Sequence, residues 1–520
     1  MNKPIVWAVG GSDCSSSSGC QADLFTCQDF NVHVSTIITA VTAQNAQEVL
    51  EIDFCNSRLI QTQITSLEKA FFPSVIKLGL LGKESIFTMG SYLRGYTGFV
   101  VFDPVLRSTS GVVFTDPYNL KRFIFPYVDL LTPNIPEVET FLQKKIHSQK
   151  DMIVAAQSFL RLGVKSVLLK GGHLKSNKAC DFFTNGKKEF WLINSKIKQT
   201  NVRGTGCSLS SAISASLALR YSLEDALTLG KMYVYQGIRL NLKIGNNILL
   251  GRKGFPRCSI DLPMATQHKK TVLCSPFPSC GHLGFYPIVD SAEWIYKLLT
   301  LGVRTMQLRI KNHKLSVVKK IVIESVDLSR RYRAKLFIND YWKLAIESGA
   351  YGIHLGQDDL RSADILAIRG ANLRLGVSTH SLYELSCAHA VSPSYIAFGP
   401  IYKTASKIMP FLPQGLPNLR YWYEISPYPV VAIGGINLER LEAVLSTGVN
   451  NIAVISAIQT NPEKVVPDFC SRISHFSHSS TQRIDFTRLQ FTKKTIVSPF
   501  PLRETLPNLV KTKKRFLQRP

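Results

Sequence analysis

The sequence lacks two features that would have set its class at once. No run of 18 or more uninterrupted apolar residues occurs, which argues against a membrane-spanning helix and against a membrane partner. The eleven cysteines include no CxxC pair, so neither a zinc module nor a disulfide framework is indicated. We therefore predict small buried thiols in a reducing compartment, and hence a cytoplasmic protein.

Acidic residues are also scarce. The chain has 36 Asp and Glu against 62 Lys and Arg, a net charge of +26. Most basic residues are dispersed, but residues 475–520 hold ten Lys or Arg and two acids. No aromatic–basic RNA motif or zinc finger accompanies this tail, so we predict a solvated, disordered segment rather than a nucleic-acid-binding arm. Salt-dependent retention on nucleic acid, lost when the tail is deleted, would favour the alternative.

The chain is 520 residues long and 45% apolar, enough for two large or three ordinary domains. In the first half, apolar segments at residues 5–9, 35–41, 75–79, 99–103 and 166–170 alternate with helical patterns, which is typical of buried parallel strands. The periodicity weakens from residue 242 to 284, where four prolines fall. We predict an α/β domain over residues 1–265 and a linker over 266–284.

The second half alternates more regularly. Eight short apolar segments, beginning near residues 285, 305, 335, 352, 373, 395, 430 and 451, are separated by helical patterns. Eight β/α units in about 190 residues predict a compact (β/α)₈ TIM barrel over residues 285–474. In that fold the chemistry lies on the loops that follow the strands, and the polar residues here fall there.

In the first half, several polar residues follow predicted strands. Arg203-Gly-Thr-Gly-Cys207 opens a predicted helix, where backbone N–H groups can bind an anion and where a thiolate is favoured at Cys207. Asp103 and Glu137 suit a magnesium ion bound to phosphates, and Asn134 lies three residues before Glu137. Lys170 ends a strand and precedes two glycines, where it could reach a phosphate.

These segments resemble a known family. The motifs GSD(x)₆CQADL at residues 11–24, ITAVTAQN at 38–45, KLGLLG at 77–82, DPV at 103–105, TPNIPE at 132–137, LLKGGH at 168–173 and GTGC at 204–207 are similar to hydroxymethylpyrimidine (phosphate) kinase. The resemblance implies a ribokinase-like three-layer α/β fold and ATP-dependent phosphorylation of hydroxymethylpyrimidine and then of its monophosphate. It covers residues 3–248.

The resemblance also assigns roles. It places the pyrimidine near Gly11, Asp23 and Gln44, and a magnesium ion near Asp103 and Glu137. It assigns the nucleotide phosphates to Asn134 and Lys170, the transferred phosphoryl group to Gly204 and Gly206, and the base to Cys207. One departure is the run Cys14-Ser-Ser-Ser-Ser-Gly19, where the family has Pro and then a Gly-Gly-Ala-like sequence; another is Leu80 in place of a Met. Serine would be strained at backbone angles that only glycine adopts easily. This strain could change the turnover of the kinase, or the balance between the first and the second phosphorylation.

In the second half, the strand Gln307-Leu-Arg309-Ile-Lys311 points three polar side chains the same way. Inward cations are costly unless they face an anion. Asp340 and Asp359 follow the next two strands and have no obvious basic partner nearby in the sequence, so they could share a magnesium ion. Further candidate residues follow the later strands: Thr404, Ser406 and Lys407 after the sixth, Gly435 after the seventh and Ser456 after the eighth. The predicted rim thus holds a cationic site for pyrophosphate and a second site for a monophosphate.

The second half resembles thiamine-phosphate synthase. The motifs are VRTMQLRIK at residues 303–311, FINDYWKLA at 337–345, GIHLGQDDL at 352–360, GVSTHS at 376–381, FGPIYKTASK at 398–407, AIGGI at 432–436 and NNIAVISAI at 450–458. The resemblance implies that hydroxymethylpyrimidine pyrophosphate joins a thiazole phosphate, with release of pyrophosphate. It implies binding of the pyrimidine pyrophosphate by Gln307, Arg309, Lys311, Asn339 and Lys407, and of magnesium by Asp340 and Asp359. It further places Ser378 at the reacting centre, and Thr404, Ser406, Gly435 and Ser456 at the thiazole phosphate.

Together these patterns predict a fused bifunctional enzyme of thiamine biosynthesis that uses Mg²⁺ and ATP on small-molecule substrates. Arg309 and Lys407, with Cys207 and Lys170, are the predicted catalytic residues. Three alternatives stay open: a thiazole tautomerase in the second half, a ligand-binding or regulatory protein with a degenerate kinase half, and a nucleic-acid binder. The complete QxRxK row with both aspartates argues against the tautomerase. The sequence permits a homo-oligomer without indicating one.

Overall fold

The first half is built around one mixed ten-stranded sheet. We analysed a computed structural model that describes residues 3–45, 48–107, 114–198, 202–267, 275–404 and 412–479. The strand order is β12-β9-β8-β7-β6-β5-β4-β1-β2-β3. The strands are β1 (Ile5–Asp13), β2 (His33–Gln44), β3 (Val49–Phe54), β4 (Val75–Leu78), β5 (Phe99–Phe102), β6 (Leu130–Leu131), β7 (Val167–Leu169), β8 (Lys178–Thr184), β9 (Glu189–Ser195) and β12 (Met264–Thr266).

The predicted strands form the parallel centre of this sheet. Strands β2, β1, β4, β5, β6 and β7 run parallel, while β3, β8, β9 and β12 are antiparallel additions at the two edges. The predicted segments lie within or overlap the observed strands, because continuous apolar runs are the pattern of a doubly covered parallel sheet. The edge strands were not predicted, since half-buried antiparallel strands carry a weaker signal.

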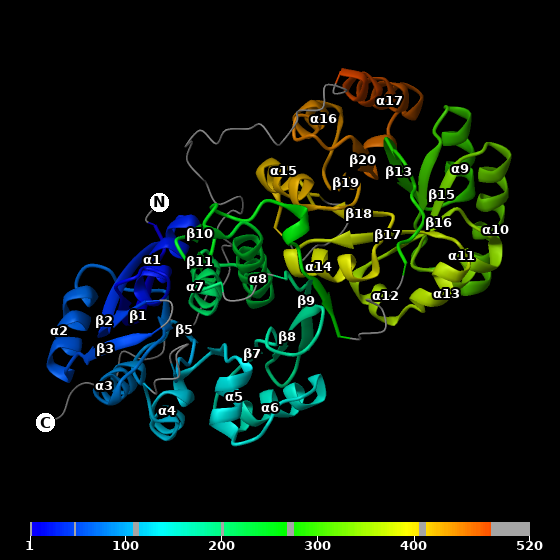
Figure 1. Cartoon of the computed structure of the whole chain (residues 1–520). Coiled ribbons are helices and arrows are strands. Elements are labelled where there is room, and N and C mark those ends of the chain that lie inside the picture. Colours follow the sequence, from blue (N-terminus) through cyan, green and yellow to red (C-terminus); the bar gives the residue numbers. More distant parts are fainter. Residues whose placement is uncertain are drawn as a thin grey trace, which may run out of the picture.

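Helices surround this sheet (Figure 1). They are α1 (Gly19–Asp29), α2 (Ser57–Glu68), α3 (Lys83–Leu93), α4 (Pro117–Phe123), α5 (Ile135–Leu142), α6 (Gln149–Arg161), α7 (Thr205–Ala218) and α8 (Leu223–Arg239), with 3₁₀ turns η1 (Phe125–Tyr127) and η2 (Ser259–Asp261). A small hairpin, β10 (Leu242–Ile244) and β11 (Asn247–Leu249), follows α8. Nearly all of α7 and much of α8 are buried, so these two helices form an interior layer rather than a surface.

The second half closes into a barrel of eight parallel strands in chain order, as predicted. The strands are β13 (Phe285–Val289), β14 (Thr305–Leu308), β15 (Lys335–Asn339), β16 (Gly352–Leu355), β17 (Arg374–Thr379), β18 (Tyr395–Phe398), β19 (Val430–Ile433) and β20 (Asn451–Val454). The helices are α9 (Ala292–Thr300), α10 (Leu315–Arg331), α11 (Trp342–Ser348), α12 (Gln357–Ser362), α13 (Ile365–Gly370), α14 (Leu382–Val391), α15 (Gly415–Ile425), α16 (Leu438–Leu445) and α17 (Pro462–Ser479), with the 3₁₀ turn η4 (Ser456–Ile458).

The two halves share an apolar core. One continuous cluster of buried side chains includes Leu209 and Leu227 from the first half and Leu382 and Tyr421 from the barrel. Helix α14 packs against α8 and β12, and Figure 1 shows α14 beside α8. The first half and the barrel are therefore packed together rather than merely linked. Residues 268–274 of the predicted linker and 480–520 of the predicted tail lie outside the described residues.

No helix in the described ranges is long and apolar enough to cross a membrane. All ten cysteines that the structure describes are free.

Candidate active sites

The first cavity lies beside the first-half sheet, where strands β1, β4, β5 and β7 end. It encloses about 780 Å³. All ten residues predicted for this half line it: Gly11, Asp23, Gln44, Asp103, Asn134, Lys170, Glu137, Gly204, Gly206 and Cys207. They come from separate segments of the chain and meet because the ends of parallel strands and the start of α7 converge at one edge of the sheet.

Asp103 and Lys170 form a buried ion pair in this cavity. Lys170 Nζ lies 2.7 Å from Asp103 Oδ1, and Asp103 is 2% exposed. A Cβ on Gly206 would lie 3.4 Å from both Asp103 Oδ2 and Lys170 Nζ, so the glycine lets the start of α7 approach the charged pair. A phosphate would bind favourably between the backbone N–H groups at the start of this helix and the lysine ammonium group.

Glu137 lies beside this pair at the start of α5. It forms a capping box with Asn134: the Asn134 N–H donates to Glu137 Oε2 at 2.7 Å, and the Glu137 N–H donates to Asn134 Oδ1 at 2.9 Å. Burial raises the pKa of Glu137 to about 7, which the charge of Lys170 opposes and that of Asp103 reinforces. Burial disfavours the charged carboxylate, and a cation bound beside it would offset that cost.

Cys207 differs from its predicted state. The sequence predicted a thiolate favoured by the start of α7, but burial raises the pKa of Cys207 to about 11, although the charge of Lys77 opposes the shift. Loss of solvation outweighs the nearby cation, and a pKa of about 11 favours the thiol at neutral pH. Its position in the cavity is as predicted.

Lys77 was not among the predicted site residues. Its Nζ lies 2.9 and 2.8 Å from the two carboxylate oxygens of Asp23, and Ser211 Oγ donates to Asp23 at 2.6 Å. Lys77 and Asp23 are each 1% exposed. The Asp23 carboxylate is therefore held by protein partners and positions Lys77. A lysine inside the apolar strand of the KLGLLG motif was the signal, because lysine is almost never buried without a partner.

The serine-rich loop is organised around Asp13. Its carboxylate accepts hydrogen bonds from the backbone N–H groups of Ser15 and Ser18 and from the hydroxyls of Ser15, Ser17 and Ser18. These bonds lower the pKa of Asp13 against the effect of burial. Ser16 has φ +56°, which confirms that one serine adopts a backbone angle that favours glycine. The serines thus supply donors that order the loop.

This loop packs on the start of α7. A Cβ on Gly204, which has φ +80°, would lie 2.1 Å from the carbonyl oxygen of Ser17. Gly204 is therefore required for this close approach. Arg107, His173 and Asn247 also line the cavity and were not predicted, because isolated polar residues in loops carry no sequence pattern.

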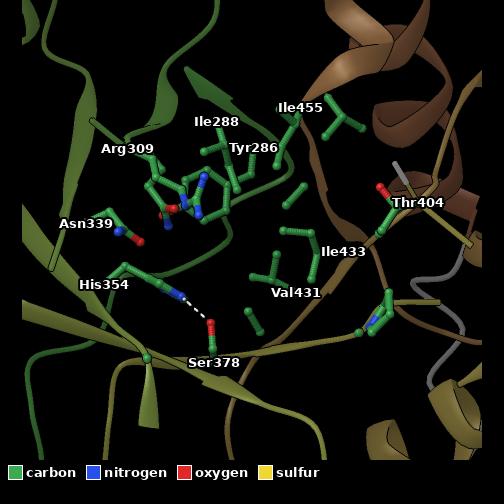
Figure 2. Close-up of a pocket in the computed structure, with 18 of the residues that line it drawn as sticks. Tyr286, Ile288, Arg309, Asn339, His354, Ser378, Thr404, Val431, Ile433 and Ile455 are labelled. Atoms are coloured by element: carbon green, nitrogen blue, oxygen red, sulfur yellow. Dashed lines mark hydrogen bonds between the residues drawn. The ribbon is translucent and has the colours of Figure 1, made fainter. Parts of the chain in front are cut away.

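The second cavity, of about 220 Å³, lies inside one end of the barrel. Ten predicted residues line it: Gln307, Arg309, Lys311, Asn339, Asp340, Asp359, Ser378, Thr404, Gly435 and Ser456. Figure 2 shows Arg309, Asn339 and His354 on one side and Thr404 on the other, with Val431 and Ile433 between them. Polar groups thus occupy both ends of an apolar slot. Ser406 and Lys407 lie outside the described residues.

At the polar end, Lys311 forms an ion pair with Asp340. The sequence shows no obvious basic partner near Asp340, because this partner comes from the end of the neighbouring strand. Burial and the adjacent carboxylate of Asp340 raise the pKa of Asp359. The two carboxylates therefore lie close enough to repel, which fits a shared divalent cation.

A chain of neutral hydrogen bonds crosses the barrel interior. Gln307 Nε2 donates to Tyr286 Oη at 3.3 Å, the Tyr286 and Tyr395 hydroxyls are 2.7 Å apart, and Tyr395 Oη lies 2.8 Å from His354 Nδ1. His354 Nε2 lies 2.8 Å from Ser378 Oγ (Figure 2). Burial lowers the pKa of His354 to about 4, so the ring is neutral. Of this chain, the tyrosines and His354 were not predicted, because their alternation along strands also fits an ordinary barrel core.

At the other end, Gly434 and Gly435 have φ +102° and +65°. A Cβ on Gly434 would lie 2.5 Å from Pro400 Cα, and one on Gly435 would lie 2.7 Å from the Lys403 carbonyl oxygen. The two glycines therefore allow the loops after β18 and β19 to meet beside Thr404 and Ser456. Loops after the last strands of such barrels are common phosphate sites.

Within the described ranges, no group of three or more His, Cys, Asp or Glu residues could hold a metal ion alone. The carboxylate pairs Asp103–Glu137 and Asp340–Asp359 still suit Mg²⁺, which is usually bound by one or two carboxylates with substrate phosphates and water.

Comparison with known proteins gives a match for each half. Residues 13–250 match the family model "Phosphomethylpyrimidine kinase", and residues 285–458 match "Thiamine monophosphate synthase". The thiamine-phosphate synthase of Serratia proteamaculans is 54% identical over 195 residues, which are 37% of this chain and 92% of that protein.

Two solved structures resemble the first half. The phosphomethylpyrimidine kinase of Clostridium difficile is 34% identical, with a TM-score of 0.40 and coverage of 45% of this chain and 98% of that chain. The pyridoxal kinase of Staphylococcus aureus in complex with ADP is 25% identical, with a TM-score of 0.47 and coverage of 51% and 98%.

Proposed function

The chain belongs to the thiamine-phosphate synthase family through its barrel and matches the phosphomethylpyrimidine kinase family through its first half. We propose that it is a bifunctional enzyme of thiamine biosynthesis, in which the product of the kinase half is a substrate of the synthase half. One observation carries the residue assignments: in each half, every predicted site residue that the structure describes lines one cavity. We name these the kinase cavity and the synthase cavity.

In the kinase cavity, ATP phosphorylates hydroxymethylpyrimidine and then its monophosphate. The substrate oxygen attacks the γ-phosphorus, the bond to the bridging oxygen breaks, and ADP leaves. Lys170 and the N–H groups at Gly204 and Gly206 hold the transferred group, which gains negative charge on its oxygens. Asp103 and Glu137 would hold a magnesium ion, which neutralises phosphate charge when bound. Gly11 and Gln44 contact the pyrimidine, with Asp23 fixing Lys77 beside it.

Cys207 takes the proton of the substrate hydroxyl in this proposal. A thiol with a pKa of about 11 is almost wholly protonated at pH 7, so only a small thiolate fraction is competent. The kinase rate should therefore rise with pH as the thiolate fraction grows, which tests the base assignment directly.

In the synthase cavity, the C–O bond to pyrophosphate breaks first and leaves an electron-poor pyrimidine methylene. The thiazole nitrogen then attacks this carbon. Arg309, Lys311 and Asn339 hold the pyrophosphate, and Ser378 donates to it from the end of the neutral chain through His354. Asp340 and Asp359 would hold a magnesium ion that stabilises the departing charge. Thr404, Gly435 and Ser456 hold the thiazole phosphate, and we retain Ser406 and Lys407 from the sequence.

Several finer statements belong to the same proposal. We assign the kinase to residues 1–265 and the synthase to 285–474, with the basic tail beyond. ATP and Mg²⁺ are the proposed co-substrate and cofactor, the partners are small molecules rather than nucleic acid, and a homo-oligomer is compatible with the sequence. A cytoplasmic location is supported by the ten free cysteines among the described residues.

One incubation tests the proposed function. Purified full-length protein receives hydroxymethylpyrimidine, ATP, magnesium and thiazole phosphate, and thiamine phosphate is measured. Formation of thiamine phosphate supports both activities. Formation only from preformed pyrimidine pyrophosphate would mean that the kinase half is degenerate and regulatory. The strained Ser16 in the serine-rich loop is the observation that keeps this second candidate open. No thiamine phosphate from either substrate would overturn the synthase assignment.

A further inference from the structure

The kinase half contacts the barrel at the catalytic rim. Helix α14 begins just after β17, whose Ser378 lines the synthase cavity. The N-terminal end of α14 faces the kinase half: the carboxylate of Asp225, in the first turn of α8, accepts a hydrogen bond from the backbone N–H of Tyr383 at 2.8 Å. Asp225 is 6% exposed, so this contact is buried.

The side chain of Tyr383 occupies a socket on the kinase half. Its ring lies 4.6 Å from the ring of Phe190, centroid to centroid, and Lys188 Nζ lies 4.4 Å from its centroid. Lys188 is itself fixed by an ion pair of 2.9 Å with Glu224. Backbone and side chain of Tyr383 are therefore both held by residues of the kinase half.

The loop between β17 and α14 is short and leads directly into the synthase cavity. The His380 N–H donates to Glu384 Oε2 at 2.7 Å, and His380 Nδ1 lies 2.9 Å from the same oxygen. His380 also lines the synthase cavity, two residues after Ser378. Glu384 follows Tyr383, so a shift of the first turn of α14 moves His380 and with it the strand end that carries Ser378.

We propose that Asp225 and the Tyr383 socket position the β17–α14 loop, so that the kinase half sets how the synthase cavity holds the pyrophosphate of its substrate. The electrostatics favour this contact. A buried carboxylate at the start of both α8 and α14 lies near the positive ends of two helix dipoles. The proposal rests on the proposed synthase function and adds a positioning residue from the other half of the chain.

The interface offers a control at a second contact. Arg257 of the kinase half forms an ion pair of 2.9 Å with Glu424 on α15. Glu424 is the last but one residue of its helix, and helices of such barrels run back from the catalytic rim, so this contact lies away from the loops that line the cavity. Loss of this ion pair weakens the interface and removes no contact of Asp225 or Tyr383.

The test uses full-length protein with preformed pyrimidine pyrophosphate and thiazole phosphate. Asp225→Ala is expected to raise KM for the pyrimidine pyrophosphate about 2- to 30-fold, the usual range for residues that couple sites through packed contacts. Kinase kinetics should be unchanged. Asp225→Asn, whose side-chain oxygen can still accept the Tyr383 N–H, should restore most of the affinity. Glu424→Gln, which weakens the other contact between the halves, should leave KM unaltered.

Amide hydrogen exchange gives a second readout that needs no activity. Residues 378–384 should exchange faster in Asp225→Ala and at the wild-type rate in Glu424→Gln. If Asp225→Ala does not accumulate as folded protein, Lys188→Ala is the second variant. It removes the ammonium group over the Tyr383 ring and should raise KM by a smaller factor.

Unchanged KM and exchange in Asp225→Ala, or equal effects of Asp225→Ala and Glu424→Gln, would overturn the proposal and leave a general interface contact. A wild-type protein without synthase activity would instead contradict the proposed function, and the exchange data would still decide whether Asp225 holds the loop.

Discussion

The kinase and synthase cavities differ in how their buried polar side chains are paired. In the kinase cavity, cations and carboxylates are already paired, as Lys77 with Asp23 and Lys170 with Asp103. In the synthase cavity, the deep end is a neutral chain of hydroxyls and one imidazole, and the charges lie at the rim. Buried charges need partners within the protein, whereas charges at the rim can be stabilised by water and by the substrate.

The difference matches the proposed chemistries. Phosphoryl transfer moves a highly charged group within the site, so cations must be present and held in the free enzyme. In the synthase reaction, the charged pyrophosphate leaves at the mouth of the cavity. The electron-poor pyrimidine carbon forms deeper in the cavity, where a neutral lining does not repel this carbon. The predictions below test this contrast, from the largest expected effect to the smallest.

The largest effect concerns Cys207. We expect Cys207→Ala to lower kinase turnover about 10²–10⁴-fold, the usual loss for a general base, with synthase activity unchanged. Because the pKa of about 11 lies above neutrality, the thiolate fraction rises with pH, and the wild-type kinase rate should rise from pH 7 toward pH 10. Steady-state assays of both activities against pH check this. A Cys207→Ala rate equal to that of the wild type would make Cys207 a packing residue.

The second effect concerns the paired charges. Lys77→Met leaves Asp23 buried without its partner and should destabilise the kinase half by about 3–5 kcal/mol. The double variant Lys77→Met/Asp23→Leu should regain most of that stability but not kinase activity, because apolar replacement of a buried pair is often tolerated. Denaturant unfolding combined with the kinase assay tests both statements. Full activity in the double variant would contradict a role for Lys77 in the cavity.

The third effect concerns the synthase rim. Asp340→Asn and Asp359→Asn should each lower synthase turnover about 10–100-fold, the usual scale for weakened metal sites, and leave kinase activity intact. Raised magnesium should restore part of the rate, because a weakened site refills by mass action. If the aspartates only brace loops, the Asn variants would keep both the rate and its magnesium dependence.

The smallest effect concerns acid stability of the barrel. His389 lies on α14, with Nδ1 2.8 Å from Tyr428 Oη, and burial lowers its pKa to about 4. In the unfolded chain the pKa is near 6.5, so His389 contributes stability that is complete above pH 6.5 and is lost as the pH falls toward 4. In His389→Gln, the free energy of unfolding should fall by up to about 2 kcal/mol less between pH 7 and pH 4.5 than in the wild type. Denaturant unfolding at the two pH values measures this difference. An equally steep loss in the variant would assign it to other groups.

Much of both cavities could be predicted from the sequence because their residues follow strands. Asp103 directly follows β5 and Asn339 ends β15, so each side chain lies at the carboxyl edge of a parallel sheet whatever the rest of the molecule does. The same argument could not identify Lys77, Tyr286, Tyr395 or His354, since their place along strands is also that of core residues. For the tyrosines and His354, only the hydrogen-bond partners in the folded barrel distinguish the two.

The sequence by itself determined the two α/β architectures, the order of the barrel strands and the residues at the strand ends, because hydrophobic periodicity and turn residues act locally. Tertiary structure alone decided which charges are paired and which groups titrate abnormally. It also decided that the first turn of α14 rests on Asp225 of the kinase half. Lys311 meets Asp340, and Cys207 remains a thiol, because burial and the distance between chain segments set these energies, and neither can be read from residues that are neighbours in sequence.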